Sequence, residues 1–401
     1  MNTQPDIEIG DIVELEVSSV AHGGHCVARL DGRVIFVRHT APGEKIKAEI
    51  TAFARGGRMA FAETVEVLTP SSHRVTPPCS YAGVCGGCDW QHLDVDYQRQ
   101  LKTDVVVEQL TRMGKLDVAH PALRDFQVKA LRTPETGLGW RTRVGYSTDT
   151  RGRAGFHKHS SDEVVAITKC IVAADEVADD GIMNVPWAKN AQIRAVVTST
   201  GEVAVLPDAD TANPLLTEKV GDLEYRVSAH GFWQAHKDAP AVFSAEVLRL
   251  ADVQAGDHVL DLYSGAGLFT LPLAQAVGAG GRVEAIEGDR RAAKDASHNA
   301  KNFENIVVHN AGVSQWFSQS RLKTCDVIVL DPPRTGAGAV VINKMVRLSP
   351  RTIIYVACDP AALSRDVVLL NDRGYFLEEI TGWDAFPMTH HVESIAKFVS
   401  R

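Results

Sequence analysis

The sequence predicts an α/β protein in which a doubly wound parallel sheet follows a small β-barrel and an α+β middle region. Three observations lead to this fold class. Residues 10–68 alternate apolar and polar positions, residues 79–206 combine a cysteine cluster with one helical and several strand-like stretches, and strand and helix patterns alternate from about residue 255 onward. The 401 residues are enough for two to three domains. We expect the domains to span 1–68, 69–210 and 211–401.

The composition is that of a globular protein, with 45% hydrophobic residues and a formal net charge of −8. This charge excludes a uniformly basic nucleic-acid coat protein but leaves room for a local basic patch. No stretch approaches the roughly 20 consecutive apolar residues that span a bilayer, and the acidic first residues lack an apolar signal region. We therefore expect a cytoplasmic monomer with no membrane partner, whose seven cysteines stay reduced.

The first expected unit is the barrel. Stretches of alternating apolar and polar residues are separated by turns rich in glycine, which is typical of short strands in a small barrel. They cover residues 11–20, 33–40, 45–53 and 58–68. Residues 69–80 are rich in proline, serine and threonine, which is typical of a linker.

A cysteine cluster opens the middle region. Cys79, Cys85 and Cys88 are separated by five and two residues, a helical stretch follows over residues 94–114, and a fourth cysteine, Cys170, lies far along the chain. Intervening glycines let the backbone curl so that several thiolates converge. Four cysteines suit an iron–sulfur cluster or a structural zinc ion, and the spacing does not decide between them.

Five strand–helix alternations predict the parallel sheet, with ligands at the carboxyl ends of its strands. The expected strands are residues 258–263, 282–287, 306–310, 325–330 and 352–357, and two further strands end the chain.

A cofactor crevice is expected at these strand ends. The segment LDLYSGAGLF (260–269) puts Gly265 in a small-residue turn between a strand and a helix, where the backbone can approach a ligand closely. Its pattern fits the turn of S-adenosylmethionine enzymes better than the dinucleotide fingerprint. Glu287 ends the next strand and is suited to bind ribose hydroxyls. Asp331 opens the motif DPPR, whose prolines fix a rigid loop at the crevice.

Cys358 and Glu393 are the candidate nucleophile and base. Cys358 lies at the tip of the fifth strand and before a helix, whose amino terminus is expected to lower the thiol pKa. Glu393 starts the last strand, where a carboxylate near Cys358 could act as a general base. These groups suit methylation at carbon 5 of a pyrimidine. A buried structural cysteine and a solvated surface glutamate are the alternative interpretations.

A basic segment could contact RNA. Residues 124–160 carry eight lysines and arginines against three acidic residues, one of them Glu135, and they include Trp140, Tyr146 and Phe156. Basic groups interleaved with aromatic rings suit phosphate contact and base stacking. The alternative interpretation is a solvated charged surface.

Taken together, these motifs resemble those of the RNA uridine C5-methyltransferase family over almost the whole chain. Residues 10–68 resemble the TRAM barrel, an RNA-binding module, and the catalytic part resembles a class I methyltransferase sheet. The resemblance implies S-adenosylmethionine as methyl donor and RNA as substrate, with ribosomal RNA favoured over transfer RNA. The resemblance implies a [4Fe-4S] cluster in the motif CSYAGVCGGCDWQ, held by Cys79, Cys85, Cys88 and Cys170. It implies donor contacts in the motifs GFWQ, DLYSGAGLF, VEAIE and DPPR, from Gln234, Tyr263, Gly265, Glu287 and Asp331. It also implies a nucleophile in YVACDP, Cys358, and a base in FPMTHHVESI, Glu393.

Other functions stay open at the level of sequence. DPPR also suits an enzyme that methylates an exocyclic amine, and such an enzyme needs no thiolate. A non-catalytic RNA-binding protein is a further alternative, which failure to bind the donor would favour. For the cluster we prefer a structural role in the middle domain over redox regulation.

Overall fold

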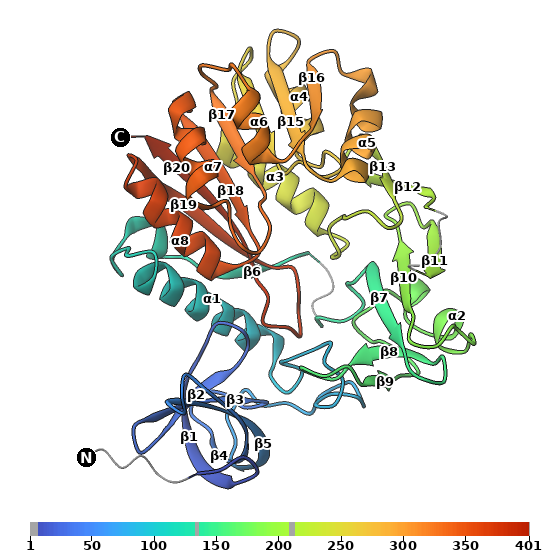
Figure 1. The fold of residues 1–401 in the computed structure, drawn as a ribbon, viewed down its shortest axis with the longest axis vertical. Coiled ribbons are helices and arrows are strands. Elements are labelled where there is room, and N and C mark those ends of the chain that lie inside the picture. The colour runs from blue at the N-terminus through green and yellow to red at the C-terminus, as the bar shows by residue number, and fades with distance from the viewer. Residues whose placement is uncertain (1–6, 133–135, 208–212, 401) are drawn as a thin grey trace.

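The computed structural model describes residues 7–132, 136–207 and 213–400. A closed five-stranded barrel lies at one end of the molecule (Figure 1). Its strands are connected in the order β1-β2-β3-β5-β4, with β3 and β5 parallel. They are β1 (Ile12–Val20), β2 (Cys26–Leu30), β3 (Arg33–Arg38), β4 (Lys45–Ala54) and β5 (Met59–Thr69).

The barrel closes because alternate strand residues point inward, among them Leu15 and Ile46, which are buried with Cys26. Glu44, just before β4, is fully buried and receives two hydrogen bonds from Arg74, Nε to Oε1 at 2.6 Å and Nη2 to Oε2 at 2.7 Å. Burial alone would raise the pKa of Glu44, but these bonds and the guanidinium charge lower it to about 2. Residues 70–80 contain no helix or strand, and Arg74 anchors this connecting segment to the barrel.

The middle region contains a five-stranded antiparallel sheet in the order β11-β10-β7-β8-β9 and the hairpin β12-β13. Its core includes Trp140, Tyr146 and Ile193. The expected boundary at 210/211 lies outside the described residues, between the sheet and the hairpin. The elements are α1 (Val95–Arg112), β6 (Val128–Ala130), β7 (Arg143–Thr148), β8 (Ala154–His157), β9 (Val164–Ala166), α2 (Asp180–Met183), β10 (Gln192–Val197), β11 (Val203–Pro207), β12 (Leu215–Val220) and β13 (Leu223–Ser228), with 3₁₀ turns at Pro121–Leu123 and Asp175–Val177.

The remaining chain builds an eight-stranded sheet in the order β16-β15-β14-β17-β18-β20-β19-β6. Its first five strands are parallel, and β20 runs antiparallel to β18. The strands are β14 (His258–Leu262), β15 (Arg282–Glu287), β16 (Ile306–Asn310), β17 (Val327–Leu330), β18 (Thr352–Ala357), β19 (Tyr375–Asp384) and β20 (Glu393–Ser400). The helices are α3 (Ala239–Ala251), α4 (Thr270–Val277), α5 (Arg290–Asn299), α6 (Val313–Gln319), α7 (Gly338–Met345) and α8 (Pro360–Asn371), with 3₁₀ turns at Ala300–Asn302 and Val346–Leu348.

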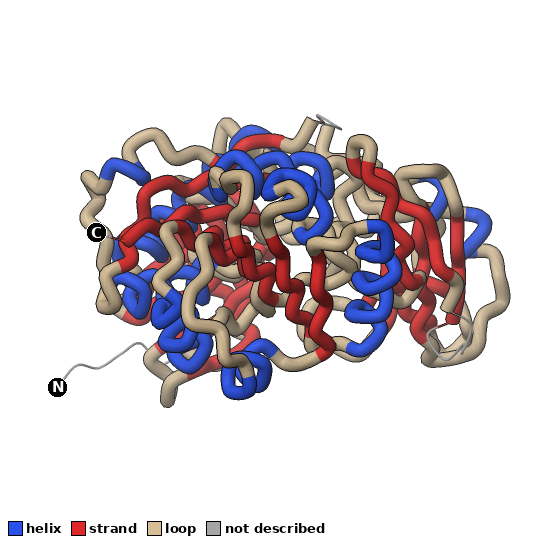
Figure 2. Tube along the Cα trace, turned by 90° about the horizontal axis from the view of Figure 1, so that it is seen from above, coloured by secondary structure: helices blue, strands red, loops and turns tan. Residues whose placement is uncertain are grey.

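Helices cover both faces of this sheet, as Figure 2 shows. One apolar core joins the sheet to α1, α6, α7 and α8, and the other joins it to α3 and α4. Two elements from early in the chain take part: β6 extends the sheet beside β19, and α1 packs against α8 (Figure 1). The predicted α/β fold with a doubly wound sheet behind a small barrel is confirmed. None of the helices in the described part of the chain has the length and apolar character of a membrane span.

Candidate functional site

The turn after β14 and the end of β15 bring Gly265 and Glu287 together. Gly265 turns the chain with a φ of +57°, which residues with a side chain rarely adopt, and its N–H donates to Glu287 Oε2 at 2.9 Å. Glu287 Oε1 accepts a second bond from the Asp289 N–H at 2.6 Å. Backbone bonds thus orient the carboxylate before any ligand binds, and the remaining lone pairs can accept from ribose hydroxyls.

Further carboxyl groups surround this turn. Asp331 follows β17, and burial together with the negative charge of Glu287 raises its pKa to about 7. Asp261 lies in β14, fully buried, and burial raises its pKa to about 7 although the Thr270 hydroxyl donates to it. A crevice that gathers three carboxyl groups suits a ligand with a positive charge, because a cation would relieve their mutual repulsion.

Cys358 and Glu393 lie side by side because of strand register. β18 and β20 are antiparallel, with Ala357 opposite Ser394. Cys358, which follows Ala357, therefore faces Glu393, which precedes Ser394. Glu393 is buried, and burial and the charge of Asp331 raise its pKa well above the ordinary value. The acid and the thiol therefore meet at the same strand ends as the crevice.

The expectation of a lowered thiol pKa is wrong. Burial, followed by the charges of Glu393 and Asp331, raises the pKa of Cys358 to about 12. The amino terminus of α8 does not offset this, because Asp359 occupies it: Asp359 Oδ1 accepts from the Ala362 N–H at 2.7 Å. Without substrates, the Cys358 thiol is protonated at neutral pH.

A pocket of about 140 Å³ opens onto Cys358. The loop after β17 contributes Arg334, the loop before β20 contributes His390 and His391, and the barrel contributes His22. Burial lowers the pKa of His391 to about 3, so its ring is neutral. Arg334 is the permanent cation of the pocket, and its charge counteracts part of the rise in the pKa of the thiol.

Of the two remaining predicted donor contacts, Tyr263 lies in the turn with Gly265 and Gln234 lies elsewhere. Tyr263 begins the turn after β14 with a φ of +62°, and its N–H donates to the Ile286 carbonyl at 2.9 Å. Gln234 is buried and lines a different pocket, of about 500 Å³, with Lys237 and His236, whose ring stacks on Trp140.

Sequence reasoning missed the residues that hold the loop before Glu393. Gln98 of α1 accepts from the Met388 N–H through Oε1 at 2.8 Å, and the Met388 carbonyl accepts from the Asp89 and Trp90 N–H groups, both at 3.0 Å. Four residues along α1, Lys102 donates to Asp384 and to the Phe386 carbonyl.

The spacing of Gln98 and Lys102 could have revealed them. Residues four positions apart lie on the same face of a helix, and both side chains lie among the buried apolar residues of α1. Polar side chains on a buried helix face need partners, which here come from the loop before Glu393.

The four cysteines of the predicted cluster line one pocket, together with Arg141. Their thiols are free, and burial raises the pKa of Cys88 to about 12. Sulfur donors beside a cationic side chain suit an anionic iron–sulfur centre. Within residues 7–132, 136–207 and 213–400, however, no group of three or more histidine, cysteine or acidic side chains has metal-binding geometry. The thiols therefore share a site and would have to move to ligate a metal.

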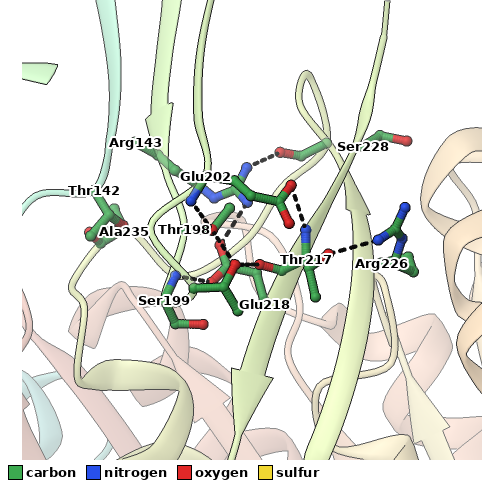
Figure 3. Close-up of polar contacts among 12 residues, drawn as sticks. Thr142, Arg143, Thr198, Ser199, Glu202, Thr217, Glu218, Arg226, Ser228 and Ala235 are labelled. Atoms are coloured by element: carbon green, nitrogen blue, oxygen red, sulfur yellow. Dashed lines mark hydrogen bonds and ion pairs between the residues drawn. The ribbon is translucent and has the colours of Figure 1, made fainter. Parts of the chain in front are cut away.

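Two of the aromatic rings in the basic segment are structural, whereas most of its lysines and arginines are exposed. Trp140 and Tyr146 are buried in the core of the middle sheet and cannot stack on bases. Arg143 is buried and donates to Glu218 at 3.0 Å, within a polar network that joins β7 to β12 (Figure 3). The predicted stacking role of these two rings is therefore wrong, and Glu135 lies outside the described residues.

Comparisons with known proteins identify the family. The family model for tRNA (uracil-5-)-methyltransferases matches residues 184–399, and the TRAM domain model matches residues 7–65. An uncharacterized RNA methyltransferase of Streptomyces coelicolor is 39% identical over 98% of this chain and 94% of its own. Another from Streptomyces avermitilis is 39% identical over 97% of this chain and 98% of its own.

Among solved structures, the tRNA (uracil-54, C5)-methyltransferase of Pyrococcus abyssi in complex with S-adenosyl-L-homocysteine has the same fold. It is 21% identical, has a TM-score of 0.73, and the match covers 96% of this chain and 100% of that one. The chain is an S-adenosylmethionine-dependent RNA methyltransferase, and it belongs to the tRNA (uracil-5-)-methyltransferase family.

Proposed function

We propose that this protein forms 5-methyluridine at a specific site in structured RNA through a covalent adduct on Cys358. The observation that carries the proposal is the position of Cys358 beside Glu393, at the strand ends where Glu287 and Asp331 also lie. A thiol, a basic carboxyl group and an acidic crevice for a cationic donor are the groups that methylation of a pyrimidine carbon requires.

The reaction follows from the weak nucleophilicity of carbon 5. The Cys358 thiolate adds to carbon 6. Carbon 5 then takes the methyl group from S-adenosylmethionine, and S-adenosylhomocysteine is the leaving group. Glu393 removes the proton from carbon 5, and elimination of the thiolate restores the ring. Burial and acidic neighbours keep Cys358 protonated, so a cation bound at Asp331 would favour ionisation of Asp331 and of Cys358.

The remaining site assignments are part of the proposal. Glu287 would hold the donor ribose, the turn at Gly265 would let the donor approach, and Asp331 would face its charged end. Tyr263 and Gln234 would complete the donor site, in agreement with the motif resemblance. The target base would have to leave its stack to reach Cys358.

A mechanism-based trap tests the adduct. RNA that carries 5-fluorouridine has no proton at carbon 5 for the base to remove, so an adduct that has accepted the methyl group persists on a denaturing gel. We expect a trapped complex with wild type and none with Cys358→Ala. With unmodified RNA, Glu393→Gln should accumulate the methylated adduct. Full methylation by Cys358→Ala would instead indicate an enzyme acting on an exocyclic amine.

The RNA target is the finer part of the proposal. On the motif resemblance we propose ribosomal RNA rather than transfer RNA. Incubation of total RNA from a deletion strain with labelled donor, followed by mapping of the modified nucleotide, decides between them. Label confined to transfer RNA would contradict the assignment.

We also propose that Cys79, Cys85, Cys88 and Cys170 hold a [4Fe-4S] cluster. Their common pocket and its arginine support this. When bound, such a cluster would connect the loop that carries Cys79, Cys85 and Cys88, here called the cysteine loop, to the segment around Cys170. Iron and sulfide analysis of anaerobically purified protein, with its visible absorbance, separates iron from zinc. Four Cys→Ser single variants should each lose the metal, whereas Cys325→Ser should keep it.

The division into domains at 1–68, 69–210 and 211–401, a monomeric state and a cytoplasmic location also stay proposals. Sedimentation at several concentrations tests the oligomeric state, and cell fractionation tests the location.

A further inference from the structure

The barrel contributes a side chain to the pocket of Cys358. His22 lies in the turn between β1 and β2, more than three hundred residues before the nucleophile, and its Nε2 lies 3.0 Å from Asp359 Oδ2. Burial alone would raise the pKa of Asp359, but the bonds from His22 and the Ala362 N–H lower it below its ordinary value. An ionised carboxylate only accepts, so His22 Nε2 is the donor.

Asp359 links this bond to the reacting sulfur. It follows Cys358 directly, and its other oxygen caps α8 through the Ala362 N–H at 2.7 Å. The carboxylate is thus held from two sides, by the helix and by the barrel. Losing the His22 bond would free Asp359 to rotate, and the backbone of Cys358 would lose one of its restraints.

The turn that carries His22 is itself firmly docked. The Trp90 indole N–H donates to the Gly24 carbonyl at 3.0 Å. A Cβ at Gly24 would lie 2.9 Å from His390 Cβ, and the φ of Gly24 is +85°. The barrel turn therefore contacts both the cysteine loop and the loop before Glu393, without room for a side chain.

Resting on the proposed function of Cys358, we propose that His22 is a positioning residue of the methyltransferase. It holds Asp359, and through it the nucleophile, in the orientation that attacks the pyrimidine. The barrel is then part of the catalytic pocket as well as an RNA-binding module. This assigns to the barrel a role that is separable from RNA affinity.

The test compares variants at saturating RNA. His22→Ala should slow single-turnover formation of the 5-fluorouridine adduct about tenfold, which is the effect of losing one hydrogen bond to a charged group. Its dissociation constant for RNA should change less than about threefold. His22→Gln keeps an N–H near the Nε2 position and should restore most of the rate. A purely structural role would not give this rescue.

His39→Ala is the matched control. His39 is a second barrel histidine paired with a carboxylate, Glu63, and it lines another pocket. Its loss should leave the adduct rate at saturating RNA unchanged. The inference would be overturned, and the proposed function left standing, if His22→Ala formed the adduct at the wild-type rate. The same holds if His39→Ala slowed adduct formation as much as His22→Ala does. Absence of any Cys358-dependent adduct in wild type would overturn the proposed function, and the inference with it.

Discussion

The buried ion pair between Lys102 and Asp384 is expected to govern both stability and the loop before Glu393. Lys102 Nζ donates to Asp384 Oδ1 at 2.5 Å and to the Phe386 carbonyl at 3.0 Å. The exposed fractions of the two side chains are 0% and 1%. Asp384 Oδ2 has no hydrogen-bond partner in the described part of the chain. The informative perturbation is Lys102→Met, which keeps the volume and removes the charge.

The cost follows from burial. Without Lys102, Asp384 is a buried carboxylate with no counter-charge, and breaking such a pair costs about 3–5 kcal/mol. Replacing both partners with Lys102→Met and Asp384→Leu removes the stranded charge, and stability should return to within about 1–2 kcal/mol of wild type. The double variant still lacks the donor to the Phe386 carbonyl, so its methylation rate should stay below wild type.

Urea unfolding followed by tryptophan fluorescence measures these differences, because Trp383 adjoins Asp384. Single-turnover methylation measured on the same samples separates loop positioning from stability. A cost below about 1 kcal/mol for Lys102→Met would refute the reasoning, since it would mean that water reaches the pair. Full activity in the double variant would refute the positional role of the amine.

Three further predictions concern the crevice. The rate at which iodoacetamide labels Cys358 in the ligand-free protein should rise about tenfold per pH unit up to about pH 10, because the thiol pKa is about 12 and only the thiolate reacts. A rate that reaches a plateau near neutral pH would contradict this. The Asp261 carboxyl has a pKa of about 7 in the folded protein and about 3.9 in the unfolded chain, so wild type loses stability as the pH rises between these values. Asp261→Asn lacks this group and should gain up to about 4 kcal/mol of unfolding free energy relative to wild type from about pH 4 to 7. A difference in urea unfolding that is independent of pH would contradict this. Glu287→Gln should weaken donor binding about tenfold in calorimetry and leave RNA affinity unchanged, and equal losses in both would point to misfolding.

The chemistry of the crevice could be predicted from the sequence because parallel strands bring their carboxyl ends to one edge. Gly265, Glu287 and Asp331 each lie at or just after the end of a strand of the same sheet, so local patterns are enough to predict that they lie close together. The closeness of Cys358 and Glu393 needed one more fact, the antiparallel register of β20. The alternation of apolar and polar residues in β20 does not show which strand it pairs with, so the register follows only once its neighbour, β18, is known.

The missed features all depend on contacts through space. Burial, and then the charges of Glu393 and Asp331, raises the thiol pKa of Cys358, and a local pattern shows neither the burial nor these neighbours, which are distant in sequence. Trp140 was misassigned because a ring beside arginines looks the same in sequence whether it stacks on a base or fills a core. The docking of His22 has no local signal, since a glycine-rich turn predicts a bend and not its partner.

Met388 connects the residues after Cys88 to the loop before Glu393. It is a buried residue with a φ of +68°, a conformation that costs a residue with a side chain free energy and persists only under restraint. Gln98 holds its N–H, and the Asp89 and Trp90 N–H groups hold its carbonyl. Asp89 and Trp90 follow Cys88 directly, so anything that reshapes the cysteine loop shifts the restraints on Met388, five residues before Glu393. If these cysteines hold the proposed cluster, its binding would therefore act on the loop before Glu393 by fixing backbone geometry.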